Sequence, residues 1–354
     1  MTDGTGMTCF WEGRRTLVTG HTGFKGSWLI HLLRSAQARV FGFSLPPSGS
    51  PSLFNLAIDQ EDCTSCFGDI RSRDLLASFV DEVDPEVVIH LAAQPIVIES
   101  FRNPLETFDV NFGGTLNLLE SLRGRTSLRS VVVVTSDKVY AQASSRAPHI
   151  ESDRLGGHDP YSSSKAACEL LVDSYAKSFF NLEGVGVSTA RAGNVIGGGD
   201  WAPHRLIPDL VRAYEGKRSL PIRHPNHVRP WQHVLDPLSG YLLLAEHLAG
   251  NDPASSAYNF GPESASAVPV SEIVRRFEDW AGESFVVLEP AGEGFPENEF
   301  LSLDSSRAVA DLGFNPRWGL DQALDKTFAW YSKFRQGHSA RALCIDDVNA
   351  FSAG

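Results

Sequence analysis

The fold is decided by the stretch Thr16-Leu-Val-Thr-Gly-His-Thr-Gly-Phe-Lys-Gly26. Its first four residues form a short β-branched run typical of a buried strand, and a helix is expected over residues 26–34. Between strand and helix, the glycines Gly20, Gly23 and Gly26 let the backbone approach a pyrophosphate, whose charge the helix N-terminus stabilises. The spacing departs from G-x-G-x-x-G, and glycines also end strands for steric reasons. The strand-turn-helix context favours the phosphate-binding interpretation.

Along the rest of the first half of the chain, short β-branched runs alternate with helix-length amphipathic stretches. Further strands are predicted at 40–43, 86–91, 130–135 and 184–190, with long helices at 104–122 and 161–180. This alternation is typical of a parallel sheet covered by helices on both faces. The sequence therefore predicts an α/β fold built on a doubly wound parallel sheet of the Rossmann type.

Beyond about residue 195 the alternation gives way to loops rich in Gly and Pro, with isolated helices at 235–248, 270–281 and 320–334. This change predicts a smaller C-terminal α/β substrate domain, and residues 289–299 are expected to form a surface or lid segment. The expected parts are a dinucleotide-binding domain at 10–195 with a returning segment at about 228–260, a substrate domain at 196–227 and 261–335, and a weakly periodic tail at 336–354.

The composition narrows the class of protein. The 354 residues are 42% hydrophobic, which is enough for a large core. A net charge of -12 disfavours nucleic acid and anionic membranes as partners. Five scattered cysteines do not suggest a disulfide framework, and neither a long apolar stretch nor a signal segment is evident. We expect a cytoplasmic protein.

Two short motifs carry the chemistry. In Tyr161-Ser-Ser-Ser-Lys165 the Tyr and Lys side chains lie on one helix face, where the ammonium is expected to lower the phenol pKa and make Tyr161 a base. Thr135-Ser-Asp-Lys138 follows a predicted strand, at the end where ligands sit in open α/β sheets. Ser136 is expected to share a substrate hydroxyl with Tyr161.

Two binding questions stay open at this point. The segment after the second strand, Gly42-Phe-Ser-Leu-Pro46, has no acidic residue for an adenosine ribose, so NAD and NADP are not distinguished. Asp69, after the third strand, meets the adenine or is an ordinary turn residue. No metal is expected, because the pair Cys63 and Cys66 stands alone and the spacing of His204, His224, His227 and His233 matches no metal site.

Six stretches together resemble the extended short-chain dehydrogenase/reductase family, over roughly residues 10–335, and within it the nucleotide-sugar 4,6-dehydratases. They are Gly20-His-Thr-Gly-Phe-Lys-Gly-Ser-Trp28, His90-Leu-Ala-Ala-Gln94, Thr135-Ser-Asp-Lys138, His158-Asp-Pro-Tyr-Ser-Ser-Ser-Lys165, Ala190-Arg-Ala-Gly-Asn-Val-Ile-Gly-Gly-Gly-Asp-Trp201 and Arg229-Pro-Trp-Gln-His233. The first and fourth stretches are generic to the superfamily, whereas Ser-Asp-Lys, Gly-Gly-Gly-Asp-Trp and Arg-Pro-Trp-Gln-His are narrow signatures. Residues 141–150 depart from the family pattern because they lack its aromatic and charged residues.

The resemblance implies a bound NAD, a nucleotide-sugar substrate with CDP-glucose as the closest match, and no metal. The implied NAD contacts are Gly20, Thr22, Gly23, Phe24, Lys25, Asp69, Ile70, Leu91, Ala92, Ala93, Asn111, Tyr161 and Lys165. The implied substrate contacts are Gln94, Asn194, Arg205, Leu206, Arg229 and His233.

The resemblance also implies a reaction order. Tyr161 removes the C4 hydroxyl proton while hydride passes to NAD, with Ser136 orienting the hydroxyl and Lys165 holding the nicotinamide ribose. Water is then lost across C5 and C6, with Asp137 as the implied acid and Lys138 as a hypothetical base, which requires a neutral lysine. The hydride finally returns to C6, giving a 4-keto-6-deoxy sugar.

Alternatives from two classes remain. Another nucleotide-sugar dehydratase or an epimerase would use the same scaffold, although Asp137 and Lys138 would have no elimination to assist in an epimerase. A non-catalytic NAD sensor would have no reason to keep Ser136, Tyr161 and Lys165 together. A homodimer or homotetramer is implied, paired through the helices at 104–122 and 161–180.

Overall fold

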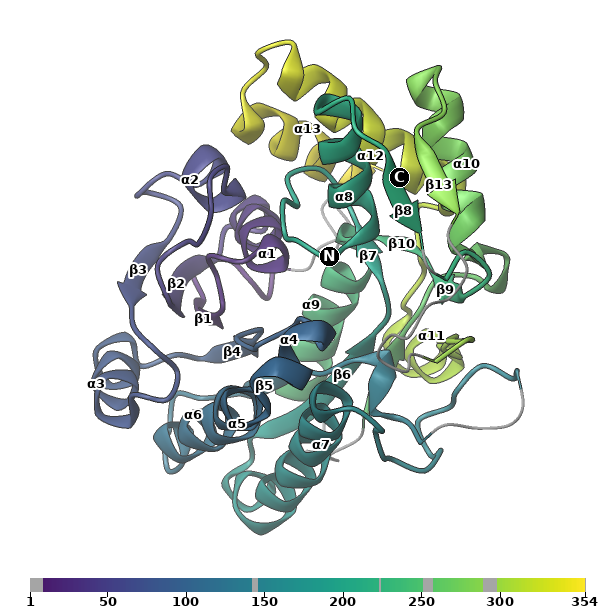
Figure 1. Cartoon of the computed structure of the whole chain (residues 1–354). Helices are drawn as coiled ribbons and strands as arrows, with labels where there is room; N and C mark the ends of the chain where they lie inside the picture. The colour runs from purple at the N-terminus through teal and green to yellow at the C-terminus, as the bar shows by residue number, and fades with distance from the viewer. Residues whose placement is uncertain (1–8, 142–145, 223, 251–256, 289–297, 354) are drawn as a thin grey trace.

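The computed structural model of the chain describes residues 9–353, except 142–145, 223, 251–256 and 289–297. Its centre is a seven-stranded parallel sheet with the strand order β11-β6-β5-β4-β1-β2-β3 (Figure 1). The strands are β1 (Arg15–Thr19), β2 (Arg39–Ser44), β3 (Thr64–Phe67), β4 (Val87–His90), β5 (Ser130–Val134), β6 (Gly186–Ala192) and β11 (Tyr258–Phe260). The predicted doubly wound parallel sheet is confirmed.

Helices cover both faces of this sheet. One face carries α1 (Phe24–Ser35) and α9 (Leu235–Gly250), and the other carries α3 (Arg73–Val83), α6 (Gly114–Leu122) and α7 (Pro160–Ser178) (Figure 1). Successive strand residues point to opposite faces, so both faces of the central strands are apolar. In β5, for example, Val131 packs in the cluster under α3, α6 and α7, and Val132 packs in the cluster under α1 and α9.

The helix predicted over 104–122 is not uniform. It consists of α5 (Pro104–Phe108), the π-helical turn η1 (Asp109–Gly113) and α6. A π turn leaves backbone carbonyls without their usual helical donor. Here the Asn111 carbonyl accepts from the Thr115 hydroxyl at 2.6 Å and from the Cys168 thiol at 3.1 Å, so α7 helps to stabilise the irregular turn.

The second half of the chain contributes short strand pairs and helices beside the sheet. The pairs are β7 (Val195–Ile196) with β10 (Gln232–His233), β9 (Val228–Pro230) with β12 (Ala267–Pro269), and β8 (Leu220–Ile222) with β13 (Val286–Leu288). The α-helices are α8 (Leu206–Glu215), α10 (Val270–Ala281), α11 (Ser306–Leu312) and α12 (Leu320–Arg335). Residues 289–297 of the predicted lid lie outside the described residues, and the division into two domains remains a prediction.

Several short helices connect these elements. They are α2 (Leu53–Ala57), α4 (Val97–Arg102), η2 (Asp137–Val139), η3 (Phe180–Glu183) and η4 (Ser264–Ser266). Of these, η2 matters most for the site, because it follows β5 and carries two of the predicted catalytic residues.

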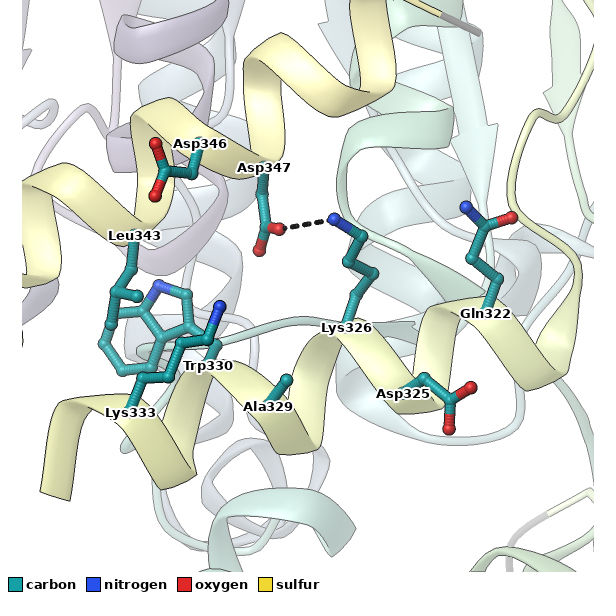
Figure 2. A pocket seen from close by; sticks show the side chains of 9 residues that line it. All are labelled: Gln322, Asp325, Lys326, Ala329, Trp330, Lys333, Leu343, Asp346 and Asp347. Carbon is teal, nitrogen blue, oxygen red and sulfur yellow. Dashed lines mark hydrogen bonds and ion pairs between the residues drawn. The ribbon is translucent and has the colours of Figure 1, made fainter. Parts of the chain in front are cut away.

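The weakly periodic tail after residue 335 contains a helix. Residues Ala340–Ala353 form helix α13, which packs against α1, α2 and α12. Between α12 and α13 lies a hollow of about 380 Å³, across which the Lys326 ammonium meets the Asp347 carboxylate at 3.1 Å (Figure 2). The Arg341 guanidinium on the other side of α13 pairs with Asp62, after α2. These ion pairs act together with the buried apolar side chains of α13 to fix the position of the helix.

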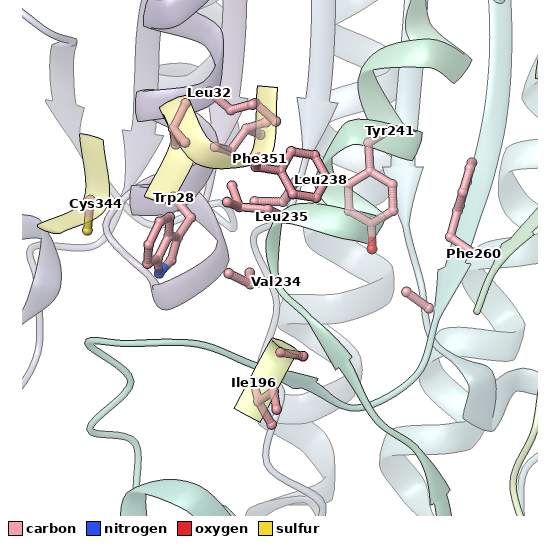
Figure 3. Packing of buried hydrophobic residues seen from close by; sticks show 14 of the residues in the cluster. Trp28, Leu32, Ile196, Val234, Leu235, Leu238, Tyr241, Phe260, Cys344 and Phe351 are labelled. Atoms are coloured by element: carbon pink, nitrogen blue, oxygen red, sulfur yellow. The ribbon is translucent and has the colours of Figure 1, made fainter. Parts of the chain in front are cut away.

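One core joins the two ends of the chain. Trp28 of α1, Leu238 of α9, Phe260 of β11 and Phe351 of α13 belong to the same buried cluster (Figure 3). Each of these side chains is at most 2% exposed. The C-terminal helix is therefore part of the packing beneath the glycine turn.

Four histidines are buried in this structure: His21, His31, His90 and His233. Burial penalises the charged imidazolium, which lowers the pKa of His21 and His31 to about 4 and that of His90 and His233 to about 3. All four are neutral in the folded protein at neutral pH.

We predict a steep loss of stability in mild acid. Below pH ~6.5 the unfolded chain protonates these histidines and the folded protein does not, so each histidine removes about 1.4 kcal/mol of stability per pH unit until its folded pKa is reached. Asp236 acts in the opposite direction. Burial raises its pKa to about 7, so in mild acid the folded protein binds one proton at this carboxyl that the unfolded chain does not bind. Calorimetry from pH 7 to 5 is expected to show the melting temperature falling.

The control compares a buried and an exposed histidine. The variant His31→Leu is expected to reduce the slope of the unfolding free energy against pH by the equivalent of about one bound proton. His338→Gln, at an exposed position, is expected to leave this slope unchanged. Equal slopes in all three proteins would contradict the assignment.

Candidate active site

A cleft of about 1150 Å³ opens at the carboxyl ends of the central strands. It extends from the glycine turn after β1, past the ends of β4 and β5, to the start of α8. The sequence-predicted residues that line it are Gly20, Thr22, Gly23, Phe24, Lys25, Asp69, Ile70, Leu91, Ala92, Ala93, Ser136, Asp137, Lys138, Tyr161, Lys165, Asn194, Arg205, Leu206 and Arg229. Residues from distant parts of the chain therefore meet in one cavity.

The glycine turn is tightly packed. Gly20 has a φ of +72°, and a Cβ at this position would lie 2.6 Å from the Ala92 backbone nitrogen. A Cβ at Gly26 would lie 2.4 Å from the Gly20 carbonyl oxygen. Glycine is thus required at both ends of the turn, which brings the start of α1 against the cleft.

The start of α1 is suited to an anion. Gly23 is its N-cap, and no side chain of the described residues caps its first backbone N–H groups. The 12-residue helix directs these N–H groups and the positive end of its dipole toward the cleft. A dinucleotide pyrophosphate fits this arrangement, because it is the ligand that such helix starts bind in Rossmann-type sheets.

Hydrogen bonds hold the loops at the end of the cleft where an adenosine would lie. The Thr22 hydroxyl lies 2.9 Å from that of Ser44 and donates to the Leu45 carbonyl at 3.0 Å, so the turn is tied to the end of β2. Asp69 accepts from the Arg71 guanidinium at 2.6 Å, and this hydrogen bond lowers the pKa of the Asp69 carboxyl. Asp69 lines the cleft as one half of an ion pair.

At the opposite end, β5 and η2 present a buried carboxylate. The Ser136 hydroxyl donates to Asp137 Oδ1 at 2.9 Å and accepts from the Lys138 backbone N–H at 3.2 Å. Asp137 is 3% exposed, and its Oδ2 has no hydrogen-bond partner among the described residues. An unpaired buried carboxylate oxygen is costly, so Oδ2 is poised to bind a ligand atom.

Tyr161 and Lys165 lie on one face of α7, as predicted, but their electrostatics differ from the prediction. Burial raises the pKa of Tyr161 to about 12, although its interaction with the Ser136 hydroxyl opposes this rise. The Lys165 ammonium donates to the Val134 carbonyl at 3.1 Å, and burial lowers its pKa. Desolvation is therefore the largest influence on the Tyr161 pKa, and Ser136 and Arg205 are the groups that lower it.

Cations surround this end of the cleft. Burial, with the Arg205 guanidinium next, lowers the pKa of Lys25 to about 8, while the Asp137 carboxylate opposes the shift. The Lys25 ammonium donates to the Tyr241 hydroxyl at 3.4 Å. A chain with a net charge of -12 thus presents a local positive region where the phosphates of a ligand would lie.

Sequence reasoning missed the residue that holds Arg205. Asp200, 5% exposed, accepts from Arg205 Nη1 at 2.9 Å and fixes the guanidinium at the start of α8. Its signal in the sequence is the aspartate of the stretch Gly-Gly-Gly-Asp-Trp201. Arg229, the other predicted phosphate ligand, is 5% exposed and donates to the Val228 carbonyl at 2.9 Å.

Three predicted residues are not among the described residues that line the cleft: Gln94, Asn111 and His233. Asn111 accepts from the Gln94 backbone N–H at 2.8 Å and donates to the Ser164 hydroxyl at 2.8 Å, so it supports the loop after β4 from behind. The Gln94 side chain is bound to the Ile96 N–H and to Thr107.

His233 is fully buried, with its ring 4.6 Å from that of Trp318 and 5.8 Å from that of Trp28. A ligand contact for His233 is therefore corrected to a core position. Among the described residues, no group of three or more His, Cys, Asp or Glu side chains is arranged to hold a metal ion. No helix of the described part is long and apolar enough to span a membrane.

Comparison with known proteins identifies relatives along most of the chain. The chain is 42% identical to the CDP-glucose 4,6-dehydratase of Salmonella typhimurium over 336 residues, which cover 93% of each protein. It is 27% identical to the UDP-glucose 4-epimerase of Erwinia amylovora, over 91% of this chain and 99% of the relative.

Among solved structures, the dTDP-glucose 4,6-dehydratase of Streptomyces venezuelae, crystallised with NAD, superposes with a TM-score of 0.78 at 26% identity, over 91% of this chain and 98% of that one. Residues 16–261 match the family described as "NAD dependent epimerase/dehydratase family". The glycine turn, the Tyr/Lys pair and the relatives agree, and the chain belongs to the NAD dependent epimerase/dehydratase family.

Proposed function

We propose that this protein is a CDP-glucose 4,6-dehydratase, a hydro-lyase that converts CDP-D-glucose to CDP-4-keto-6-deoxy-D-glucose and water. The observation that carries the proposal is the placement of Asp137 and Lys138 in the cleft, next to Ser136 and across from Tyr161. The proposal is supported by the 42% identity to an enzyme of that name.

NAD fits the glycine turn, the α1 start and the adenosine-end loops described above. When bound, it supplies the redox chemistry of the cycle by accepting a hydride at the start and returning it at the end. Gly20, Gly23 and the α1 backbone would hold its pyrophosphate, and Lys165 would hold its nicotinamide ribose. These contacts leave Tyr161 and Ser136 free to face the sugar.

The first proton transfer is assigned to Tyr161. Its hydroxyl takes the proton of the C4 hydroxyl, and Ser136 orients that hydroxyl by hydrogen bonding. Because burial holds the Tyr161 pKa high, the Ser136 hydrogen bond and the Arg205 charge, which both lower it, assist the transfer.

Elimination of water is assigned to η2. A ketone at C4 acidifies the C5 proton, whose removal we assign to Lys138. The protonated carboxyl group of Asp137 gives its proton to the departing C6 hydroxyl, which leaves as water. A lysine acts as a base only when it is neutral. Arg205 and Arg229 line the cleft and suit the oxygens of the CDP diphosphate.

A 4-epimerase is the second candidate, because the chain is 27% identical to such an enzyme. Epimerisation at C4 involves no loss of water, so it would offer the buried Asp137 carboxyl group no departing hydroxyl to protonate. The elimination chemistry is favoured for this reason.

Two further features belong to the proposal. Leu105 of α5 and Leu170 of α7 are 75% and 65% exposed, and the two helices pack side by side, so pairing through them would give a homodimer, or a homotetramer by further pairing. A cytoplasmic location is supported by the free cysteines Cys63, Cys168 and Cys344, which are buried as thiols.

The substrate test incubates the protein and NAD with CDP-glucose, dTDP-glucose and GDP-mannose separately. We expect a 4-keto product, seen by its absorbance in alkali and by a mass loss of one water, from CDP-glucose. A product from another sugar only would keep the mechanism and change the substrate. No product from any of them would contradict the proposed function.

Tyr161→Phe removes the proposed base. We expect kcat to fall about 10²- to 10⁴-fold, while calorimetric binding of CDP-glucose is retained. Tyr175→Phe is the control, since Tyr175 lies farther along α7 and donates its hydroxyl to Glu120 of α6. A Tyr161→Phe variant with the control's turnover would refute the role of Tyr161.

Lys138→Ala separates the two half-reactions. Exchange of the C5 hydrogen with solvent deuterium is expected to be lost, while a 4-keto sugar still forms and is trapped by borodeuteride reduction. Lys177→Ala is the matched control, because this lysine is exposed and pairs with Asp173. Unchanged exchange in Lys138→Ala would reject the base assignment.

A further inference from the structure

Glu169 is a buried carboxylate that the proposed chemistry does not use. It lies on α7 one turn beyond Lys165 and two turns beyond Tyr161, on the same face of the helix. Its side chain is 3% exposed. A charge buried to this extent requires several partners, and their identity indicates what the residue holds in place.

The partners of Glu169 come from the two strands next to α7. Glu169 Oε1 accepts a hydrogen bond from the Thr135 hydroxyl, directly after β5. Its Oε2 accepts from the Thr189 hydroxyl at 2.6 Å and from Arg191 Nη2 at 2.7 Å, both on β6. The Arg191 side chain is 4% exposed, so the ion pair is almost completely desolvated.

Two successive turns of α7 thus bind two successive residues at the end of β5. Lys165 donates to the Val134 carbonyl at 3.1 Å, and Glu169 accepts from Thr135. The next residues along the chain are Ser136, Asp137 and Lys138. The entry to the catalytic segment is therefore fixed to the helix that carries Tyr161.

The exit from that segment is fixed to the same ion pair. Arg191 Nη1 donates to the Tyr140 hydroxyl at 2.8 Å, and Tyr140 donates in turn to Asn259 Oδ1 at 2.6 Å. Residues 136–139 lie between Thr135 and Tyr140, whose hydroxyl groups are bound by Glu169 and Arg191 respectively. The ion pair holds both ends of the loop that presents the acid and the base.

We propose that the Glu169–Arg191 pair is a positioning device, which sets Ser136, Asp137 and Lys138 at a fixed distance from Tyr161. The assignment rests on the proposed function, because it gives these residues their roles. Hydrogen bonds to a shared, charged partner fix position more narrowly than apolar packing does. Neither Glu169 nor Arg191 needs to touch the substrate for this role.

The experiment uses the two threonines that bind the same carboxylate. Thr135→Val removes the hydrogen bond at the entry of the catalytic segment, and Thr189→Val removes the matching bond on β6, which does not lead into that segment. Both threonines are buried, at 6% and 4% exposure, so the two variants lose a comparable interaction. Thr135→Ser keeps the hydroxyl group and serves as the rescue.

We expect kcat of Thr135→Val on CDP-glucose to fall about 10- to 100-fold with little change in KM, because misplacement by about 1 Å costs a factor of that order. Thr189→Val is expected to keep kcat within about twofold of the unmodified enzyme, and Thr135→Ser to recover most of it. Melting temperatures of the two valine variants should fall by similar amounts. Equal losses of kcat in both would show a merely structural role and overturn the proposal.

A second measurement does not depend on the substrate. Crystal structures of the valine variants with NAD should show Ser136 and Asp137 displaced relative to Tyr161 in Thr135→Val, and unmoved in Thr189→Val. Unmoved residues in both variants would overturn the positioning role. If the unmodified enzyme fails to convert CDP-glucose while the displacement is seen, the proposed function fails and the positioning role stands.

Discussion

Parallel pairing of β1 with β4, and of β4 with β5, is the constraint on which the site depends. It places the ends of all three strands at one edge of the sheet, so that residues far apart in the chain face a common cleft. The glycine turn follows β1, the Leu91–Ala93 backbone follows β4, and Ser136 follows β5. Helix α7 then returns across the sheet to add Tyr161 and Lys165.

Much of this arrangement could be predicted from the sequence. The β-branched runs indicate the strands because a strand buried on both faces must be apolar throughout. The glycine turn is predictable because Gly20, Gly23 and Gly26 stand between a strand and a helix. Local signals were sufficient for these elements. The positions of Tyr161 and Lys165 on one helix face likewise follow from helical geometry alone.

Other features depend on contacts that no local pattern encodes. The π turn at Asn111 exists because Thr115 and Cys168 satisfy its carbonyl, and Cys168 lies on another helix. His233 stands in a motif rich in site residues, yet it packs between two tryptophans remote in sequence. Helix α13 was missed because its place is set by ion pairs with Asp62 and Lys326 as much as by its apolar face.

The shared core of α1 and α13 also bears on the order in which the chain can fold. Helix α1 is synthesised near the beginning and α13 near the end, yet Trp28 and Phe351 belong to one cluster. Domains commonly fold as units in the order in which they leave the ribosome. Here the nucleotide-binding half cannot complete its packing until α13 has emerged, so a nascent chain keeps part of the α1 surface uncovered for most of its synthesis.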